Sequence, residues 1–310
     1  MISMKNADIR KRSRVLRGIA LAVVLATVAL VVPNASVKPA DVELVKLRTA
    51  EGVDVGRRDV IWILGVGSDA RPGQAMTATR GDALQLIALN TKTGAASAIG
   101  IPRDSWVSIP GHGYDKINSA LYFGGPELLG RSVGNLVGVQ PDYVFVTRFE
   151  FFEDMVGAIG GIDVHNPVAF SDDPIKPKGF KAGRIHLGPY EALAFARIRH
   201  NLIRGDFDRS ANQQRVLRGI QAKVRAKADS PGFIEKGVLS VMSNLRTNLP
   251  PDELFRLAQV MAQVVPSKIT TCVVQGGIGN IGGASVVLPS VSQAKRLGND
   301  ARKDATIKHC

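Results

Sequence analysis

The sequence predicts a mixed α/β domain, with a central β-sheet flanked by helices, preceded by one transmembrane helix. Two observations predict the domain: short apolar runs that end at glycine or at a turn, and longer segments of helical periodicity that alternate with them. A third observation, an apolar run near the N-terminus, predicts the membrane helix. The sequence contains no visible repeat of the length that builds solenoids or propellers.

The N-terminal apolar run covers residues 18–32 and contains no charged side chain. With the two apolar residues before Arg17, it approaches the roughly 17–25 residues that cross a bilayer, because the long side chain of Arg17 reaches toward the interface. Six basic residues and one acidic residue lie within residues 1–17. The positive-inside rule therefore predicts a cytoplasmic tail, a single-pass helix and an extracytoplasmic domain.

A cleaved signal peptide is the alternative interpretation of this segment. Cleavage requires small side chains one and three residues before the cut. A cut after Ala35 places Pro33 at the third position, and a cut after Ala40 places Lys38 there. We therefore expect an uncleaved signal-anchor in the cell membrane, and both interpretations export the domain.

The chain that follows the anchor divides into a linker and a globular part. Residues 33–58 mix proline, polar and charged residues around a short apolar patch at 42–47, which predicts a membrane-proximal linker with one helical turn. The formal net charge is +13, of which residues 1–17 supply +5. The remaining +8 favours anionic partners such as phosphates, lipid headgroups, cell-wall polymers or nucleic acid, although a solvated basic surface explains the same charge.

The predicted strands are apolar runs bounded by glycine or by turn residues. The first of them contains Gly65 and is followed by Gly67. They are residues 60–66, 83–90, 95–101, 143–147, 162–164, 269–274 and 285–288. The predicted helices show helical periodicity, with proline near three of their starts and Gly160-Gly161 after one of them. They are residues 126–137, 149–159, 189–196, 211–228, 252–265 and 291–297.

Several common functional motifs are excluded. Residues 277–282 fit the dinucleotide pattern G-x-G-x-x-G, but a strand-like segment follows where that site needs a helix, so we expect a flexible loop. The five histidines are scattered without metal-ligand spacing. No helix-turn-helix pattern with a basic recognition helix is evident, so we expect no nucleic-acid partner.

The two cysteines, Cys272 and Cys310, favour a disulfide in an exported domain. Two free thiols are the alternative.

A first cluster of charged residues lies at the ends of the early strands. Asp69 and Arg71 follow the first strand, Arg80 and Asp82 precede the second, and Arg103 and Asp104 follow the third. These side chains could simply pair with one another, as buried charges must. The functional interpretation is a site for Mg²⁺ or Mn²⁺ beside arginines that bind phosphate oxygens.

A second cluster contains Arg197, Arg199, Asp206, Arg209 and Gln213. The first two arginines lie two residues apart and would point to one side of an extended segment. Arg209 and Gln213 lie four apart and would share one face at the start of a helix, where an anion is favoured. A solvated basic helix start is the alternative, but the predominance of arginine favours a pyrophosphate site.

Several segments, in this order, resemble the LytR-CpsA-Psr family of bacterial envelope proteins. They are RGDALQLIALN at 80–90, IPRDSWV at 101–107, DKINSALYFGG at 115–125, GGIDV at 160–164, LGPYEALAFARIRH at 187–200 and GDFDRSANQQRVL at 205–217. The resemblance runs from about residue 60 to about residue 217, and the late cysteines look like the actinobacterial version. Two positions depart from the family motif: Asn212 stands in place of arginine and Asp208 in place of glycine.

The resemblance implies a catalytic domain over residues 59–228, with residues 229–310 packed on it. It implies a phosphotransferase that moves a glycopolymer from a polyprenyl (undecaprenyl or decaprenyl) pyrophosphate carrier onto a peptidoglycan acceptor, forming a phosphodiester at the 6-hydroxyl of N-acetylmuramic acid. Two alternatives remain: a non-catalytic envelope module that binds polyprenyl phosphates or wall polymer, and a membrane-bound transcriptional regulator.

The resemblance also implies roles for individual residues. The metal positions are Asp69, Asp82 and Asp104, and the catalytic positions are Asp82, Arg80, Arg103 and Arg199. The pyrophosphate-binding positions are Arg80, Arg103, Arg197, Arg199, Arg209 and Gln213. Because a polyprenyl tail must be kept from water, we expect an apolar pocket between sheet and helices. Its candidate lining is Ile117, Leu121, Phe123, Leu129, Leu136, Phe145 and Met155, although each of these could be an ordinary core residue.

Overall fold

The computed structural model describes residues 42–50 and 59–310, except residues 72, 200, 229, 232 and 234–244. The chain divides into two compact units, Met1–Pro39 and Ala40–Cys310, and the described residues all belong to the second. The predicted cytoplasmic tail, the predicted membrane helix and most of the predicted linker therefore lie outside the described residues. Among the helices that the structure describes, none combines the length and the apolar character needed to cross a bilayer.

A mixed seven-stranded sheet forms the centre of the domain, in the order β12-β1-β7-β2-β3-β4-β13. In that order the strands are Leu245–Thr247, Val42–Lys46, Tyr143–Arg148, Val60–Ser68, Gly81–Asn90, Ala96–Gly100 and Ile269–Val273. Strand β2 lies in the middle and reads VIWILGVGS, a nearly continuous apolar run, because both of its faces are covered. The predicted mixed sheet flanked by helices is confirmed.

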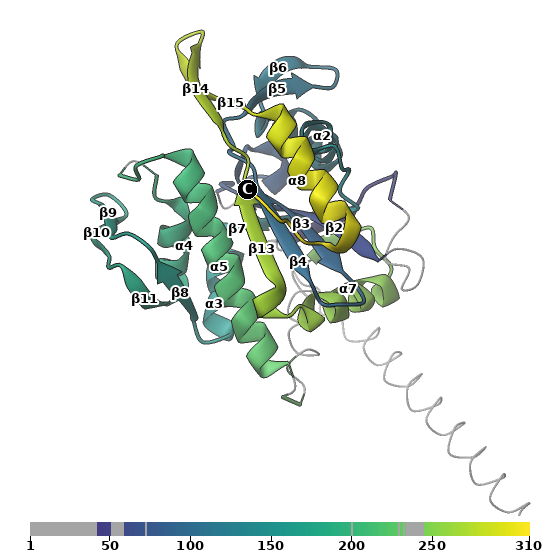
Figure 1. Ribbon diagram of the computed structural model, residues 1–310, viewed down its shortest axis with the longest axis vertical. Helices are drawn as coiled ribbons and strands as arrows, with labels where there is room; N and C mark the ends of the chain where they lie inside the picture. The colour runs from purple at the N-terminus through teal and green to yellow at the C-terminus, as the bar shows by residue number, and fades with distance from the viewer. Residues whose placement is uncertain are drawn as a thin grey trace, which may run out of the picture. The chain divides into compact units, whose positions relative to one another are not determined.

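Helices cover both faces of this sheet (Figure 1). On one face, α2 (Ser119–Val137) and α8 (Val291–Asp304) enclose a core with even-numbered residues of β2 and β3 such as Leu64 and Leu86. On the other face, α7 (Pro251–Gln263) packs against the odd-numbered residues, including Ile63. The two faces alternate along each strand because successive side chains of a strand point in opposite directions.

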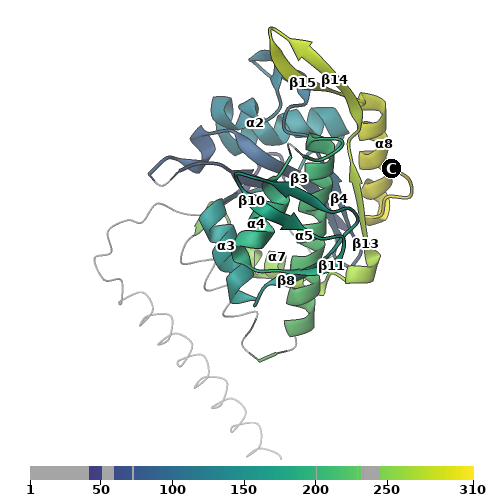
Figure 2. The same cartoon turned by 90° about the vertical axis from the view of Figure 1, so that its left-hand side faces the viewer.

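A side lobe lies next to the α7 face, and Figure 2 shows it turned toward the viewer. Its helices are α3 (Phe149–Ala158), α4 (Pro189–Arg197) and α5 (Asp206–Lys227). Its short strands are β8 (Ile162–Asn166), β9 (Phe170–Asp172), β10 (Lys176–Phe180) and β11 (Gly183–Leu187). Phe180 and Phe195 lie in its own apolar core. The amide of Gln214 on α5 donates to the carbonyls of Ala98 on β4, at 3.2 Å, and Cys272 on β13, at 2.7 Å.

Most of the strands begin or end at one shared end of the sheet, which we call the carboxyl end. Strands β2, β7, β4 and β13 finish there, and β1 and β3 begin there. This follows from the register, which pairs Ser68 with both Gly81 and Arg148, Val42 with Thr147, and Val273 with Gly100. Loops that leave this end therefore lie close together.

Two further hairpins stand beyond the carboxyl end. One is formed by β5 (Trp106–Ile109) and β6 (Gly113–Lys116), and the other by β14 (Gly276–Ile281) and β15 (Ala284–Pro289). The expectation of a loop at residues 277–282 was therefore wrong, because most of this segment pairs with β15.

The expectation of a linker with a helical turn was also wrong for residues 42–46. Val42 and Leu44 are buried, and the segment pairs with β7 and β12 as strand β1. The alternation VELVK is the strand signal, and it is only five residues long. Helix α5 also begins earlier than expected, at Asp206. Helix α2 contains a break at Gly124 and Gly125, just before the segment that was predicted as a helix.

A disulfide joins Cys272 on β13 to Cys310, with 5.5 Å between their Cα atoms. The segment before Cys310 lies along the same strand, since the amide of Ile307 donates to Thr270 Oγ1 at 3.0 Å. The side-chain amide of Gln293 on α8 donates from Nε2 to the backbone carbonyl of Cys310 at 2.7 Å. The bond therefore links the outer strand β13, the C-terminal segment and α8.

We predict that Cys310→Ser lowers the free energy of unfolding by about 3–4 kcal/mol, because the bond closes a loop over a sequence separation of 38 residues. Urea denaturation measures the difference. Reductant should bring the wild-type protein to the stability of the variant and leave the variant unchanged. A wild-type midpoint that does not respond to reductant would contradict the prediction.

Candidate functional site

The carboxyl end of the sheet gathers charged side chains from three neighbouring strands. Asp69 follows β2, Asp82 is the second residue of β3, and Arg103 and Asp104 follow β4. The first turn of α5 adds Asp206 and Arg209 from the side lobe. Because β2, β3 and β4 are adjacent in the sheet, residues far apart in sequence form one cluster.

Arg103 lies at the centre of this cluster. Its guanidinium Nη1 pairs with Asp82 Oδ1, and its backbone amide donates to Asp206 Oδ2 at 3.0 Å. Burial alone would lower the pKa of Arg103, but the negative charges of Asp82, Asp104 and Asp206 outweigh it and raise that pKa. Arg103 therefore stays a cation, fixed to the sheet on one side and to α5 on the other.

Asp104 faces basic groups with both carboxylate oxygens. Its Oδ1 lies 3.1 Å from Lys116 Nζ, and its Oδ2 lies 3.5 Å from Arg199 Nη1. These pairs hold β6 and the segment after α4 against the loop that follows β4. The resemblance implies a metal position at Asp104, and in the structure its carboxylate also lies beside a third cation, with Oδ1 4.0 Å from Arg103 Nε.

Asp69 and Asp82 are the carboxylates that fit a metal ion. Burial raises the pKa of Asp69 and the negative charge of Asp82 raises it further, while Arg103 and Arg197 act in the opposite direction. A divalent cation would relieve this repulsion. Within the described ranges, no group of three or more acidic, histidine or cysteine side chains is placed to hold a metal. Mg²⁺ fits such a partial site, since it commonly uses one or two carboxylates together with water and substrate phosphates.

Arg209 is buried at the start of α5, where its Nη2 pairs with Asp206 Oδ1. Burial raises the pKa of Asp206, against the positive charge of Arg209. Among the described residues, the buried Nε–H groups of Arg103 and Arg209 have no hydrogen-bond acceptor. Because an unpaired buried donor is costly, these two groups indicate where an anion would bind.

The other arginines of the predicted site border this pair. Arg197 is exposed at the end of α4 and its guanidinium lies 4.5 Å from the ring centroid of Phe149, a cation–π contact. Arg199 is half-buried and pairs with Asp104. Arg80 is exposed immediately before β3. Together with Arg103 and Arg209 they place five guanidinium groups around the carboxyl end. These positive charges outnumber the carboxylates of the cluster, and the excess positive charge suits a pyrophosphate.

Gln213, a pyrophosphate-binding position by the resemblance, makes two hydrogen bonds within the domain. Its amide accepts a hydrogen bond from Gln85 Nε2 at 3.0 Å and donates to the carbonyl of Ala196 at 3.3 Å. It therefore joins α5 to β3 and to the end of α4. The sequence signal for this contact is Gln85 itself, a polar residue inside the apolar run ALQLIAL.

Arg148, which sequence reasoning missed, holds the loop that carries Asp69. It is the last residue of β7 and is 3% exposed. Its Nη1 donates to the carbonyls of Ala70 and Arg71 at 3.1 and 3.0 Å, and its Nη2 donates to the carbonyl of Gln74. The geometry of Asp69 therefore depends on a guanidinium group from the neighbouring strand.

The candidate lipid-lining residues do not share one place. Four of them, Ile117, Leu121, Leu129 and Leu136, are buried in the core between α2 and the sheet. Phe145 packs against the core on the other face of the sheet. Phe123 is exposed and stacks on His112, with 4.8 Å between the ring centroids, and Met155 lies on α3 in the side lobe. A surface hollow lined by residues such as Trp62 and Arg302 shares no residue with the charged cluster.

Comparison with known proteins gives consistent matches. Residues 34–303 match the LytR_cpsA_psr family, a longer region than the sequence motifs covered. A polyisoprenyl-teichoic acid–peptidoglycan teichoic acid transferase TagU of Bacillus anthracis is 36% identical over 206 residues, which are 66% of this chain and 65% of the relative. The match thus spans just under two thirds of that relative's length.

Solved structures are similar over most of the described domain. Bacillus subtilis TagV has a TM-score of 0.64 and 28% identity, over 81% of this chain and 100% of that one. The LytR-CPS2A-psr family protein YwtF (TagT) with bound octaprenyl pyrophosphate lipid has a TM-score of 0.62 and 25% identity, over 84% of this chain and 96% of that one.

We predict that Arg148→Met increases amide hydrogen exchange in residues 69–76 about tenfold, because three carbonyl groups of this loop lose their donor. Mass spectrometry of peptides from this loop measures the change. Arg71→Met is the matched control, since Arg71 is an exposed arginine of the same loop. Equal exchange in the two variants would contradict the proposed role of Arg148.

We predict that Asp206→Asn lowers the free energy of unfolding by about 3–5 kcal/mol, because it leaves the buried Arg209 without its charged partner. Asp208→Asn is the control: Asp208 pairs with the exposed Arg204, and its loss should cost within about 1 kcal/mol. Chemical denaturation compares the two variants. An equal loss of unfolding free energy in the two variants would show that the Asp206–Arg209 pair stabilises the domain no more than an exposed ion pair does.

Proposed function

The chain belongs to the LytR-CpsA-Psr family, and from this premise we propose that it is a phosphotransferase that moves a glycopolymer from a polyprenyl pyrophosphate carrier onto peptidoglycan. The printed name of the TagU relative, a teichoic acid transferase, supports the reaction class. The lipid bound to YwtF, an octaprenyl pyrophosphate, supports the carrier class.

One observation carries the proposal for this chain: the buried Nε–H groups of Arg103 and Arg209 lack an acceptor. They lie in a cluster whose carboxylates already pair with guanidinium Nη atoms. A pyrophosphate oxygen that reached these Nε–H groups would meet two donors that have no hydrogen-bond acceptor, although Asp104 Oδ1 lies 4.0 Å from Arg103 Nε. The second phosphate would lie toward Arg199 and Arg197, which border the cluster on the side of α4.

In the proposed reaction, a hydroxyl group of the peptidoglycan acceptor attacks the phosphorus on the sugar side of the pyrophosphate. A new phosphorus–oxygen bond forms, the bond to the bridging oxygen breaks, and the polyprenyl monophosphate leaves with that oxygen. The hydroxyl proton passes to a carboxylate of the site or to water. Arg103, Arg199 and Arg209 stabilise the negative charge that develops on the leaving phosphate, so positioning and electrostatics supply most of the catalysis.

We propose that Asp69 and Asp82 hold Mg²⁺, or Mn²⁺, when substrate is present. The ion would neutralise charge on the pyrophosphate oxygens. The repulsion between the two carboxylates supports this assignment. Asp82 also forms an ion pair with Arg103. It would therefore connect the metal ion to the arginine cluster.

We further propose that residues 18–32 anchor the chain in the cell membrane, with residues 1–17 cytoplasmic and the domain outside. The basic flank supports this orientation, and the disulfide between Cys272 and Cys310 suits an oxidising compartment. The proposed catalytic domain includes residues 229–310 as an integral part, since β13 is a strand of the central sheet and α8 packs against α2.

We predict that Asp82→Ala and Arg199→Ala each lower the transfer rate by about 10²–10³-fold. Arg199→Ala removes a positive charge beside the pyrophosphate, and Asp82→Ala removes a proposed metal ligand and the charged partner of Arg103. Transfer from a lipid-linked donor to peptidoglycan is the measurement, with circular dichroism as the check on folding. Arg184→Ala, at an exposed arginine of β11, should retain full activity.

Near-normal rates in both site variants would contradict the assigned site. A wild-type protein that binds the donor but shows neither transfer nor pyrophosphate cleavage, with or without Mg²⁺, would instead identify a non-catalytic binding module.

A further inference from the structure

The β14–β15 hairpin has no role in the proposed reaction, and its composition is unusual for an exposed element. Residues 276–289, GGIGNIGGASVVLP, contain no charged side chain. Ile278 is 74% exposed, Leu288 47% and Ile281 37%. Both cartoon views show this hairpin projecting away from the body of the domain (Figures 1 and 2). Exposed aliphatic side chains on a projecting, uncharged hairpin indicate a contact surface.

The hairpin is fixed to the charged site through Val287, which pairs with Ile278 in the middle of the two strands. Val287 packs with Phe207, the residue after Asp206, and its amide donates to the carbonyl of Asp104 at 2.9 Å. Ser105 forms a parallel bridge with the same residue. The hairpin is therefore a rigid extension of the loop that carries Arg103 and Asp104, and whatever it contacts is held at a set position relative to the site.

The hairpin lies at the same end of the sheet at which the described chain begins. Strand β13 finishes at the carboxyl end, and the hairpin follows it. Strand β1 starts at this end, because Val42 pairs with Thr147 near the end of β7. The first described strand therefore begins at the end of the sheet that carries both the site and the hairpin.

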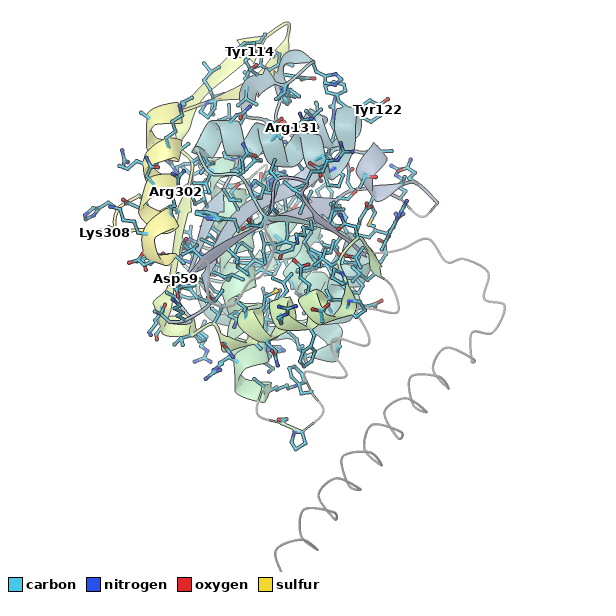
Figure 3. All side chains as sticks on the ribbon, turned by 90° about the vertical axis from the view of Figure 1, so that its right-hand side faces the viewer. Asp59, Tyr114, Tyr122, Arg131, Arg302 and Lys308 are labelled. Atoms are coloured by element: carbon cyan, nitrogen blue, oxygen red, sulfur yellow. A yellow bond between two sulfur atoms is a disulfide. The ribbon has the colours of Figure 1, made fainter. Side chains whose placement is uncertain are left out.

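Two exposed tyrosines accompany the hairpin. Tyr114 on β6 is 68% exposed and Tyr122 on α2 is 62% exposed. Figure 3 shows both at the end of the molecule from which the hairpin projects. Tyrosine has an apolar ring and a polar tip, and it is enriched where membrane proteins meet the headgroup layer.

We propose that the β14–β15 hairpin contacts the surface of the lipid bilayer and so sets the distance of the pyrophosphate site from the membrane. The absence of charge between residues 276 and 289 argues against an ion-paired protein partner. Among the described residues, β14 pairs only with β15, so its outer edge needs water. Hydrocarbon cannot satisfy that edge, and the contact is therefore at headgroup depth.

The inference deepens the proposed function, because a polyprenyl-linked donor stays in the bilayer. A rigid spacer of this kind would hold the arginine cluster at the level where the pyrophosphate leaves the headgroup layer. It predicts a lipid contact that can be measured without any catalysis.

The test uses the full chain in nanodiscs of phosphatidylglycerol and phosphatidylethanolamine, with and without lipids brominated near the headgroup. Ile278→Trp supplies a fluorophore, and the wild-type protein gives the background of its two native tryptophans. Val168→Trp is the matched control, since Val168 is 56% exposed but lies in the side lobe of the same tethered chain. We expect bromolipids to quench the added Ile278→Trp fluorescence at least twofold more strongly. Equal quenching in the two variants overturns the inference.

A second arm separates the hairpin from the chemistry. Ile278→Asp should lower transfer from a long-chain donor in bilayers about fivefold or more, and leave transfer from a short-chain, water-soluble donor unchanged. Equal effects on both donors overturn the inference. Wild-type protein that is inactive with both donors contradicts the proposed function, and the quenching result then decides the inference alone. An emission change of Ile278→Trp with soluble peptidoglycan fragments, without bromolipid quenching, identifies a glycan contact and overturns it.

Discussion

The rest of the site depends on the pairing of the half-buried guanidinium of Arg103 and the buried guanidinium of Arg209 with carboxylates. Asp82 on β3 pairs with Arg103, and Asp206 pairs with Arg209 on the same helix, α5. The backbone amide of Arg103 donates to Asp206, and this bond connects the central sheet to the side lobe. Two neighbouring cations can be buried only if carboxylates separate them. The pairs use the outer nitrogens of each guanidinium and leave the Nε–H groups unused. The contacts that stabilise the domain thus also prepare a binding place for an anion.

The scaffold brings these groups together through the order of its strands. Because β2, β3 and β4 are neighbours, three sequence segments meet at the carboxyl end, and α5 closes the cluster from the side. The same helix bonds through Gln213 to Gln85 and through Gln214 to the backbone of β4 and β13. Side-chain amides therefore fix the position of α5 relative to the strands of the sheet. The position of Arg209, in the first turn of α5, depends on these contacts.

Sequence reasoning succeeded where the signal was local. Apolar runs predicted most of the central strands, and Asp82 and Arg103 were placed at the strand ends where the structure brings them together. It failed where a partner decides the outcome. Phe145 and Val144 are equally apolar, and only the pairing of β7 shows which one faces α2. Arg148 was missed because its acceptors are backbone carbonyls, which no sequence pattern marks. The positions of Lys116 and Arg199 beside Asp104 were also missed, because both cations come from other segments of the chain.

The strand order also has a consequence for how the domain reaches its native state. Both outer strands of the central sheet come late in the sequence: β12 (Leu245–Thr247) beside β1 and β13 (Ile269–Val273) beside β4. During synthesis, β1 and β4 therefore remain open edges until these late segments arrive. Open edges attract other extended chains, and long-range strand pairing is slow. We expect the nascent chain to pass through a vulnerable period in which assistance from folding factors determines the yield of native protein.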